Sequence, residues 1–143
     1  MPGNSRIGSS RIDIIGQNGN TGEHYEADPN GIHQRTPGSK LDLGKPRADL
    51  VFDGFPLALL AVAEVATFGA NKYTEHGWLS VPDGVKRYTA AMDRHRLAEG
   101  AGHNHDAESG LPHAAHLAWN ALARLELMLQ EEARLGLEET ARA

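Results

Sequence analysis

The sequence contains no cysteine and no long apolar run. Without cysteine the protein can form no disulfide, no thiolate zinc site and no cysteine nucleophile. No apolar run approaches the ~20 residues that a transmembrane helix requires, and the first residues, MPGNSRIGSS, lack the apolar segment of a signal peptide. We therefore expect a soluble protein of the cytoplasm.

An excess of basic charge is also missing. The chain has 14 Lys and Arg against 19 Asp and Glu, which gives a formal net charge of −5. A general binder of nucleic acid or of anionic membranes needs a positive surface. We therefore expect neither nucleic acid nor a membrane as a partner.

The length of 143 residues is enough for one hydrophobic core but not for two. Gly, Ser, Asn and Pro dominate residues 1–39, which predicts a flexible or extended N-terminal arm. We predict the folded domain over residues 40–132 and a C-terminal tail over residues 133–143. At the start of the folded domain, residues 40–56 are predicted to be an extended lead-in, since Pro46 disfavours a helix there.

Three later segments have helical patterns. One begins at Pro56 and is predicted to end at Gly69, and another covers residues 85–100. The third is predicted to start at Ser109 as its N-cap, with Pro112 in the first turn, and it meets no helix breaker before Gly136. These segments predict an all-α fold, a small bundle of three or four helices. Three such helices leave an apolar side uncovered, which favours a homo-oligomer.

The last helix carries two stripes at helical spacing. The apolar stripe, predicted to face the core, consists of Leu111, Ala114, Ala118, Leu122, Leu125 and Leu129. The second stripe consists of His113, His116, Asn120 and Arg124. A single histidine there would more often be a solvated or hydrogen-bonded residue. Two imidazoles at i and i+3, with Asp106 and Glu108 just upstream, instead favour a metal or phosphate site.

Glu64 is the only charged residue between Pro56 and Gly69. It shares a helical face with Leu57 and Phe68, so the pattern predicts that its carboxylate points toward the core. An unpaired carboxylate there would cost several kcal/mol, so it should be paired, neutral or bound to a metal.

Several cations and aromatic residues are candidates for nucleotide binding. Lys72 lies next to Tyr73 and close to Trp78, so this segment could hold a triphosphate and stack a base, although ordinary packing fits the spacing equally well. Lys45 and Arg47 could reach a phosphate or form surface ion pairs.

His95 is predicted to point inward from its helix, with Arg94 beside it, and a structural histidine is the alternative. Two short strings nearby carry little weight. His103, Asn104 and His105 spell HNH without the ββα setting or basic surface of that nuclease. His105 and Asp106 spell HD, but between glycines and not on a helix.

The runs KPRADLV, AEVATFGANKY, GW, RYTAAMDRH and DAESGLPHAAHLAWNALARLE resemble the phage-borne dATP/dGTP diphosphohydrolase family, which includes the MazZ-type enzymes. The resemblance covers about residues 40–126. It implies hydrolysis of dGTP or dATP to the monophosphate and pyrophosphate in phage nucleotide metabolism, in the host cytoplasm. The family is similar to all-α NTP pyrophosphohydrolases, which build a metal site from an ExxE and an ExxD helix and pair their chains. The resemblance thus implies a homodimer or homotetramer.

Residue by residue, His113 and His116 replace the two acids of ExxD, while Glu64 matches one acid of ExxE. Ala61 and Thr67 occupy the positions three before and three after it. The resemblance implies a divalent metal, Mg²⁺ or Mn²⁺. Either the imidazoles shift the preference toward Mn²⁺, Co²⁺ or Zn²⁺, or Asp106 and Glu108 supply the missing oxygen ligands and the histidines contact the phosphates. The implied metal ligands are Glu64, His95, Asp106, His113 and His116.

The resemblance also implies roles in catalysis and substrate binding. One of Glu64, Asp106 and Glu108 would orient the attacking water. Lys72 and Arg94 would hold the β and γ phosphates. The substrate-binding set is Lys45, Arg47, Lys72, Tyr73, Trp78, Arg94 and Asn120. Since the Glu64 helix lacks a second acid, a non-catalytic nucleotide-binding protein is the alternative.

Overall fold

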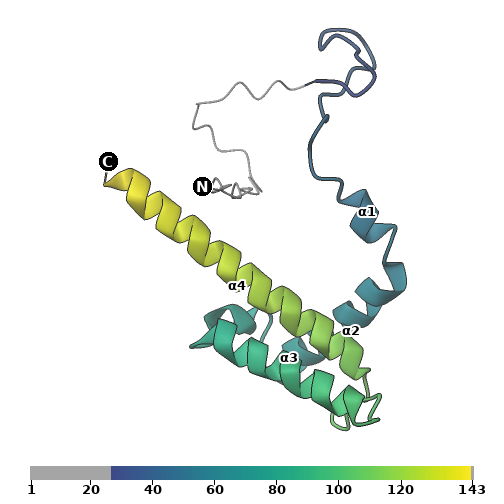
Figure 1. The fold of residues 1–143 in the computed structure, drawn as a ribbon, viewed down its shortest axis with the longest axis vertical. Coiled ribbons are helices and arrows are strands. Elements are labelled where there is room, and N and C mark those ends of the chain that lie inside the picture. The colour runs from purple at the N-terminus through teal and green to yellow at the C-terminus, as the bar shows by residue number, and fades with distance from the viewer. Residues whose placement is uncertain (1–26, 143) are drawn as a thin grey trace, which may run out of the picture. The chain divides into compact units, whose positions relative to one another are not determined.

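The structure is a computed structural model that describes residues 27–142, which fall in two compact units, Met1–Pro46 and Arg47–Ala143. Within the described residues there are helices and no strand, which confirms the all-α prediction (Figure 1). The elements in chain order are α1 (Asp49–Phe52), α2 (Pro56–Lys72), the 3-10 helix η1 (Gly77–Ser80), α3 (Gly84–Gly100) and α4 (His113–Ala141).

The described part of the first unit is irregular. The carboxylate of Asp28 accepts hydrogen bonds from the backbone N–H groups of Asn30 and Lys40, both at 2.7 Å. The N–H of Leu43 donates to the carbonyl of Ala27 at 3.1 Å. These bonds close a loop without a helix. Residues 1–26, most of the predicted arm, lie outside the described residues.

The prediction that residues 40–56 are extended was wrong for the second half of this segment, where helix α1 forms. Pro46 precedes this turn, and Asp49 provides a negative charge in its first turn, which favours a helix N-terminus. The side chain of Arg47 pairs with Asp49. Proline therefore lies ahead of a helix here and does not exclude one.

Helix α4 is the centre of the second unit and packs against both α2 and α3. Helix α3 runs antiparallel beside the first half of α4 (Figure 1). A Cβ added to Gly84 would lie 2.6 Å from Leu127, so glycine permits the close approach of the two helices. Among residues 27–142, the buried apolar residues are Val65, Ala115 and Ala123.

An aromatic cluster joins η1, α3 and α4. Trp78, Tyr88 and Trp119 meet edge to face, with ring centroids 6.4 Å, 5.8 Å and 5.7 Å apart. The hydroxyl of Tyr88 donates to the carbonyl of Trp78 at 3.0 Å. Edge-to-face packing of this kind is favoured by the charge distribution of aromatic rings. The cluster fixes η1 against the helix pair.

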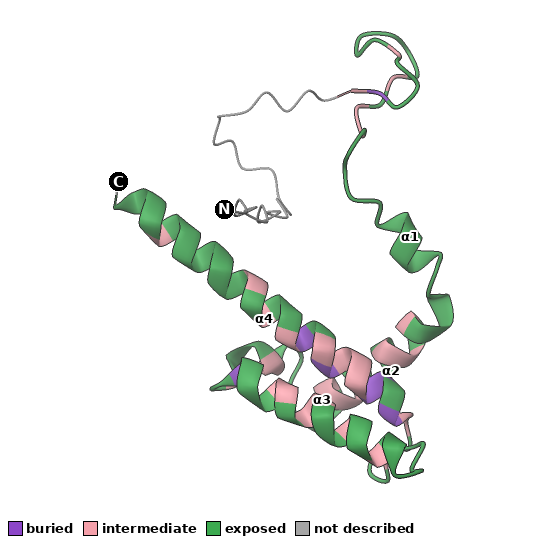
Figure 2. Cartoon of the chain, viewed as in Figure 1, coloured by how far each residue is buried: buried purple, intermediate pink, exposed green. Residues whose placement is uncertain are grey.

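The apolar stripe of α4 does not face the core, contrary to the sequence-based expectation. Leu122 and Leu125 are 51% and 50% exposed, whereas His113, His116 and Asn120 are only 7%, 8% and 6% exposed. Figure 2 shows the buried positions of α4 gathered in its first half. The small residues Ala115 and Ala123 let neighbouring helices approach this polar side, and its polar groups find partners within the protein.

Three helix boundaries also differ from those predicted. Helix α2 passes Gly69 and ends at Lys72, and α4 starts at His113, so Ser109 is not its N-cap. Helix α4 also passes Gly136 and ends at Ala141, so most of the predicted tail is helical. An interior glycine costs a helix only about 1 kcal/mol, which good helix formers on either side can offset. Here Arg134 also pairs with Glu131 and Glu138 along the helix surface.

No helix in residues 27–142 combines the length and the apolar character needed to cross a bilayer.

Candidate functional site

Three histidines meet where the end of α3 lies beside the start of α4. Nδ1 of His95 on α3 lies 2.8 Å from Nδ1 of His113 on α4. The His95 ring also stacks on that of His116, with centroids 4.5 Å apart and an angle of 11° between the planes. The i, i+3 spacing on α4 thus places two imidazoles around one imidazole of α3, and His95 points inward as predicted.

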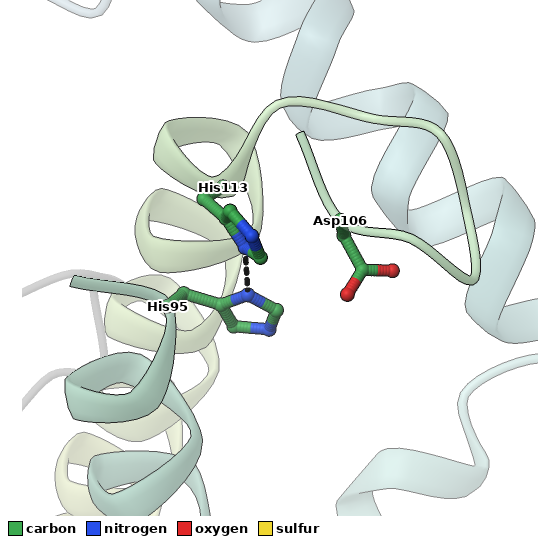
Figure 3. Close-up of side chains that lie close together, drawn as sticks. All are labelled: His95, Asp106 and His113. Atoms are coloured by element: carbon green, nitrogen blue, oxygen red, sulfur yellow. Dashed lines mark hydrogen bonds between the residues drawn. The ribbon is translucent and has the colours of Figure 1, made fainter. Parts of the chain in front are cut away.

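Asp106 reaches the histidines from the loop between α3 and α4 (Figure 3). One potential ligand atom from each of His95, Asp106 and His113 lies within 4.8 Å of the other two. Two imidazoles and a carboxylate form a donor set typical of Mn²⁺, Co²⁺ and Zn²⁺ sites. These three residues could therefore hold a divalent metal.

The separation of the two imidazoles fits such a site after a small adjustment. Tetrahedral coordination at ~2.0–2.1 Å per bond places two nitrogen ligands about 3.3 Å apart. The two Nδ1 atoms lie 2.8 Å apart, which is the distance of a hydrogen bond between one protonated and one unprotonated nitrogen. Movement of that proton to the other nitrogen of its ring and a small separation of the rings would suit a metal ion.

Ser109 holds the Asp106 carboxylate in place. Oδ2 of Asp106 accepts the backbone N–H and the hydroxyl of Ser109, both at 2.9 Å. The Oγ of Ser109 also lies 2.7 Å from Nε2 of His116 and accepts the N–H of Leu111 at 3.2 Å. The sequence pattern missed this role because it assigned Ser109 to a helix cap. The D-x-x-S spacing from Asp106 was the available signal, since short polar side chains commonly bond a backbone N–H nearby.

The loop that carries Asp106 is itself anchored to the start of α4. His105 and Pro112 form an isolated antiparallel bridge, and the N–H of Asp106 donates to the carbonyl of Leu111 at 2.9 Å. The N–H of His113 donates to the carbonyl of Asn104 at 3.0 Å. The backbone therefore fixes the carboxylate and His113 relative to each other.

The surroundings favour the protonation states that a metal site needs. Burial lowers the pKa of both His95 and His116, and nearby imidazoles lower them further. Burial raises the pKa of Asp106, but the hydrogen bonds from Ser109 and the nearby histidines more than offset this and lower it overall. At neutral pH, His95 and His116 are consequently neutral and Asp106 is ionised, as metal binding requires.

A cation lies beside the same loop. Nζ of Lys72, at the end of α2, pairs with the carboxylate of Glu108, which raises the pKa of Lys72. The ammonium lies 5.9 Å from the ring centroid of Phe68 and 5.4 Å from that of Tyr73. The structure thus brings together Lys72, Tyr73 and Glu108 of the predicted set.

Glu64 is exposed, which corrects the prediction that it points into the core. Val65, the next residue along α2, is the one that packs inward. Glu64 lines an open pocket together with Phe68, Asn71 and Ser109. Ser109 thus belongs both to the wall of this pocket and to the hydrogen bonds around Asp106.

Two other predicted residues already have partners in the fold. Trp78 packs against Tyr88 and Trp119 in the aromatic cluster. Asn120 is buried, and its amide donates to the carbonyl of His116 at 2.8 Å, one turn earlier on α4.

The remaining predicted cations are Arg94, Arg47 and Lys45. Arg94 is exposed on α3, next to His95. Arg47 pairs with Asp49 at the start of α1, and Lys45 belongs to the first unit.

Comparison with known proteins gives concordant matches. The family model described as dATP/dGTP diphosphohydrolase, N-terminal, matches residues 35–134. A dATP/dGTP diphosphohydrolase of Salmonella phage PMBT28 is 36% identical over 81 residues, which cover 57% of this chain and 26% of that protein. The chain thus spans about a quarter of the length of this relative. No solved structure matches the chain. The family match includes every histidine, acid and cation of the site described above, and the chain belongs to the dATP/dGTP diphosphohydrolase N-terminal family.

Proposed function

We propose that this protein hydrolyses the purine deoxynucleoside triphosphates dGTP and dATP to the monophosphate and pyrophosphate, with a divalent metal held by His95, Asp106 and His113. One observation carries the proposal. Ser109 both bonds the Asp106 carboxylate and lines the pocket that contains Glu64. The metal-binding group and a space for a substrate are therefore adjacent, in a chain of a diphosphohydrolase family.

The pocket has the chemistry expected for a nucleoside. Apolar side chains of Leu60, Phe68 and Leu111 line it, together with the polar side chains of Glu64 and Asn71. Ligand sites commonly combine apolar walls with a few polar groups that fix orientation. We assign the apolar residues to contact with the purine ring, and Glu64 and Asn71 to hydrogen bonds with the base or sugar.

The triphosphate would lie between this pocket and the histidines. A divalent metal there would neutralise phosphate charge and favour ionisation of a water molecule. Lys72 would exchange its pairing with Glu108 for the β and γ phosphates, with Arg94 as the second proposed cation. Glu108 would then be free to orient the attacking water and accept its proton.

We further propose that the protein acts as a homodimer or homotetramer. Leu57 and Leu60 of α2 are 82% and 65% exposed, and Leu122 and Leu125 of α4 are about half exposed. Burying one such leucine contributes about 1.5–3 kcal/mol, and large exposed apolar patches commonly mark interfaces. Because Leu60 also lines the pocket, a second copy on this face would help to close the nucleotide site.

The test is a product assay with matched variants. The purified protein is incubated with each dNTP and NTP in Mg²⁺, Mn²⁺, Co²⁺ or Zn²⁺, and the products are separated by ion exchange. His113→Ala removes a proposed ligand, and His103→Ala removes an exposed histidine of the neighbouring loop. Hydrolysis that needs metal and is lost only in His113→Ala supports the proposal. Binding without hydrolysis under every metal favours the alternative of a nucleotide-binding protein.

A further inference from the structure

The hydroxyl of Ser109 lies at the centre of three polar contacts. Its Oγ is 2.9 Å from Oδ2 of Asp106, 2.7 Å from Nε2 of His116 and 3.2 Å from the N–H of Leu111. A serine hydroxyl has one proton to donate and two lone pairs that accept. All three contacts are hydrogen bonds only if the hydroxyl donates once and accepts twice.

Two of the three neighbours have fixed roles. The N–H of Leu111 can only donate, so it uses one lone pair of Oγ. An ionised carboxylate can only accept, so the contact with Asp106 must use the single hydroxyl proton. The remaining lone pair of Oγ faces His116, and Nε2 of His116 must therefore carry a proton.

The opposite arrangement is unfavourable. If the hydroxyl donated to Nε2 of His116, the oxygens of Ser109 and Asp106 would face each other at 2.9 Å with no proton between them. One of those oxygens is ionised and the site is half-buried, so the repulsion is weakly screened and the lost charge-assisted hydrogen bond is expensive.

We infer that Ser109 is a positioning residue that fixes the tautomer of His116, with the proton on Nε2 and the lone pair on Nδ1. Nε2 is then committed to Ser109 and is not the atom that binds a metal. His116 contributes in two ways. Through Ser109 it helps to orient the Asp106 carboxylate, and through Nδ1 it offers an acceptor to a metal ion or a water molecule.

The accessibility of Nδ1 supports this assignment. Nδ1 of His116 makes no hydrogen bond within the described part of the chain. Within that same part, no buried side-chain nitrogen or oxygen is without a hydrogen-bond partner. Nδ1 is consequently not among the fully buried side-chain atoms, although the residue as a whole is only 8% exposed. The functional meaning of this tautomer rests on the proposed function, because a fixed lone pair on Nδ1 has a role only where a metal ion or a substrate is bound.

The test observes the histidine ring directly by NMR. Protein labelled with ¹⁵N is studied without metal or nucleotide at about pH 8, above the ordinary histidine pKa of about 6.5. The ¹⁵N shifts of the ring nitrogens distinguish protonated from unprotonated atoms, and the signals that vanish in His116→Gln assign the ring. We expect a proton on Nε2 and none on Nδ1. A proton on Nδ1 would overturn the inference.

Two variants test whether Ser109 is the cause. Ser109→Thr keeps the hydroxyl, whereas Ser109→Ala removes it. We expect the Nε2 proton of His116 to exchange with water about tenfold faster in Ser109→Ala, because its hydrogen bond is lost, and at nearly the wild-type rate in Ser109→Thr. Equal exchange in the wild type and Ser109→Ala would refute the role of Ser109. If Ser109→Ala does not fold, the NMR measurement on the wild-type protein still decides which nitrogen of His116 carries the proton.

These measurements are independent of hydrolysis. An inactive protein with the expected tautomer would contradict the proposed function and leave the role of Ser109 standing. An active protein with the opposite tautomer would contradict only the inference about Ser109.

Discussion

Nδ1 of His95 and Nδ1 of His113 lie 2.8 Å apart, so imidazoles from two different helices share one proton. If both nitrogens bind a metal, this proton must leave Nδ1, and a neutral imidazole can hold it on its own Nε2 instead. We therefore predict that Zn²⁺ binding at about pH 8 leaves a proton on Nε2 and none on Nδ1 of both His95 and His113. The ¹⁵N shifts of the ring nitrogens, measured with and without Zn²⁺, give the position of the proton. A proton that stays on Nδ1 of either ring with Zn²⁺ bound would show that this atom is not a ligand.

Metal affinity should also depend on the identity of the histidines. We predict that His113→Ala weakens metal binding by at least about 100-fold, more than the 10–100-fold typical of residues that only support a ligand. His103→Ala is the matched control, since this exposed histidine lies in the same part of the chain but outside the metal-binding group. Equal affinity in the two variants would exclude His113 as a ligand.

Lys72 should act on the triphosphate. A charge-assisted hydrogen bond contributes about 1.5–3 kcal/mol, so Lys72→Met should lower kcat/KM by about 10–150-fold. The control is Lys86→Met, which changes an exposed lysine at the start of α3. A similar small decrease in kcat/KM in both variants would mean that Lys72 pairs with Glu108 and does not bind the triphosphate.

The exposed leucines should determine the oligomeric state. We predict that wild-type protein is a dimer or tetramer by light scattering, and that Leu122→Glu together with Leu125→Glu shifts it toward monomer. The control is Leu97→Glu, which changes an exposed leucine on α3 and should leave the oligomeric state unchanged. A monomeric wild-type protein at micromolar concentration would contradict the proposed assembly.

The lowered pKa values of His95 and His116 predict the pH dependence of stability. The unfolded chain takes up protons at these positions near the ordinary pKa of about 6.5, whereas the folded protein does so only at lower pH. Between these values the unfolded state binds more protons, so the free energy of unfolding falls as the pH falls below about 6.5. Urea unfolding at several pH values measures this, and His116→Gln should reduce the dependence. An unchanged dependence in that variant would contradict the prediction.

The spacing of residues predicted part of the site. The i, i+3 pair His113 and His116 lies on one helical face by geometry alone, and the same periodicity placed His95 inward. The all-α fold followed from three helical patterns. These features depend on local chain geometry, which the sequence specifies directly.

The burial of each face could not be predicted in the same way. Leu122 and Leu125 looked like core residues, yet the neighbouring helices pack near His113, His116 and Asn120. Hydrophobic patterns do not tell which apolar side meets another helix of the same chain and which is left exposed. Glu64 was misplaced for the same reason, because Val65 is the α2 residue that packs inward.

The role of Ser109 depends on a loop that periodicity does not describe. Its hydroxyl reaches Asp106 and His116 only because the bridge between His105 and Pro112 folds the loop back onto α4. That bridge joins residues seven apart without any repeating pattern. The sequence pattern singled out most of the residues that the structure brings together here, and it left their hydrogen bonds undetermined.

The most direct test of the account is the identity of the products formed from dGTP. Wild-type protein and His113→Ala are incubated with dGTP and Mn²⁺, and the products are separated by ion exchange. The account predicts dGMP and pyrophosphate in equal amounts from the wild type, and intact dGTP with His113→Ala or when a chelator removes the metal. Release of dGDP and phosphate, or dGTP recovered intact from the wild type with every divalent metal, would contradict it.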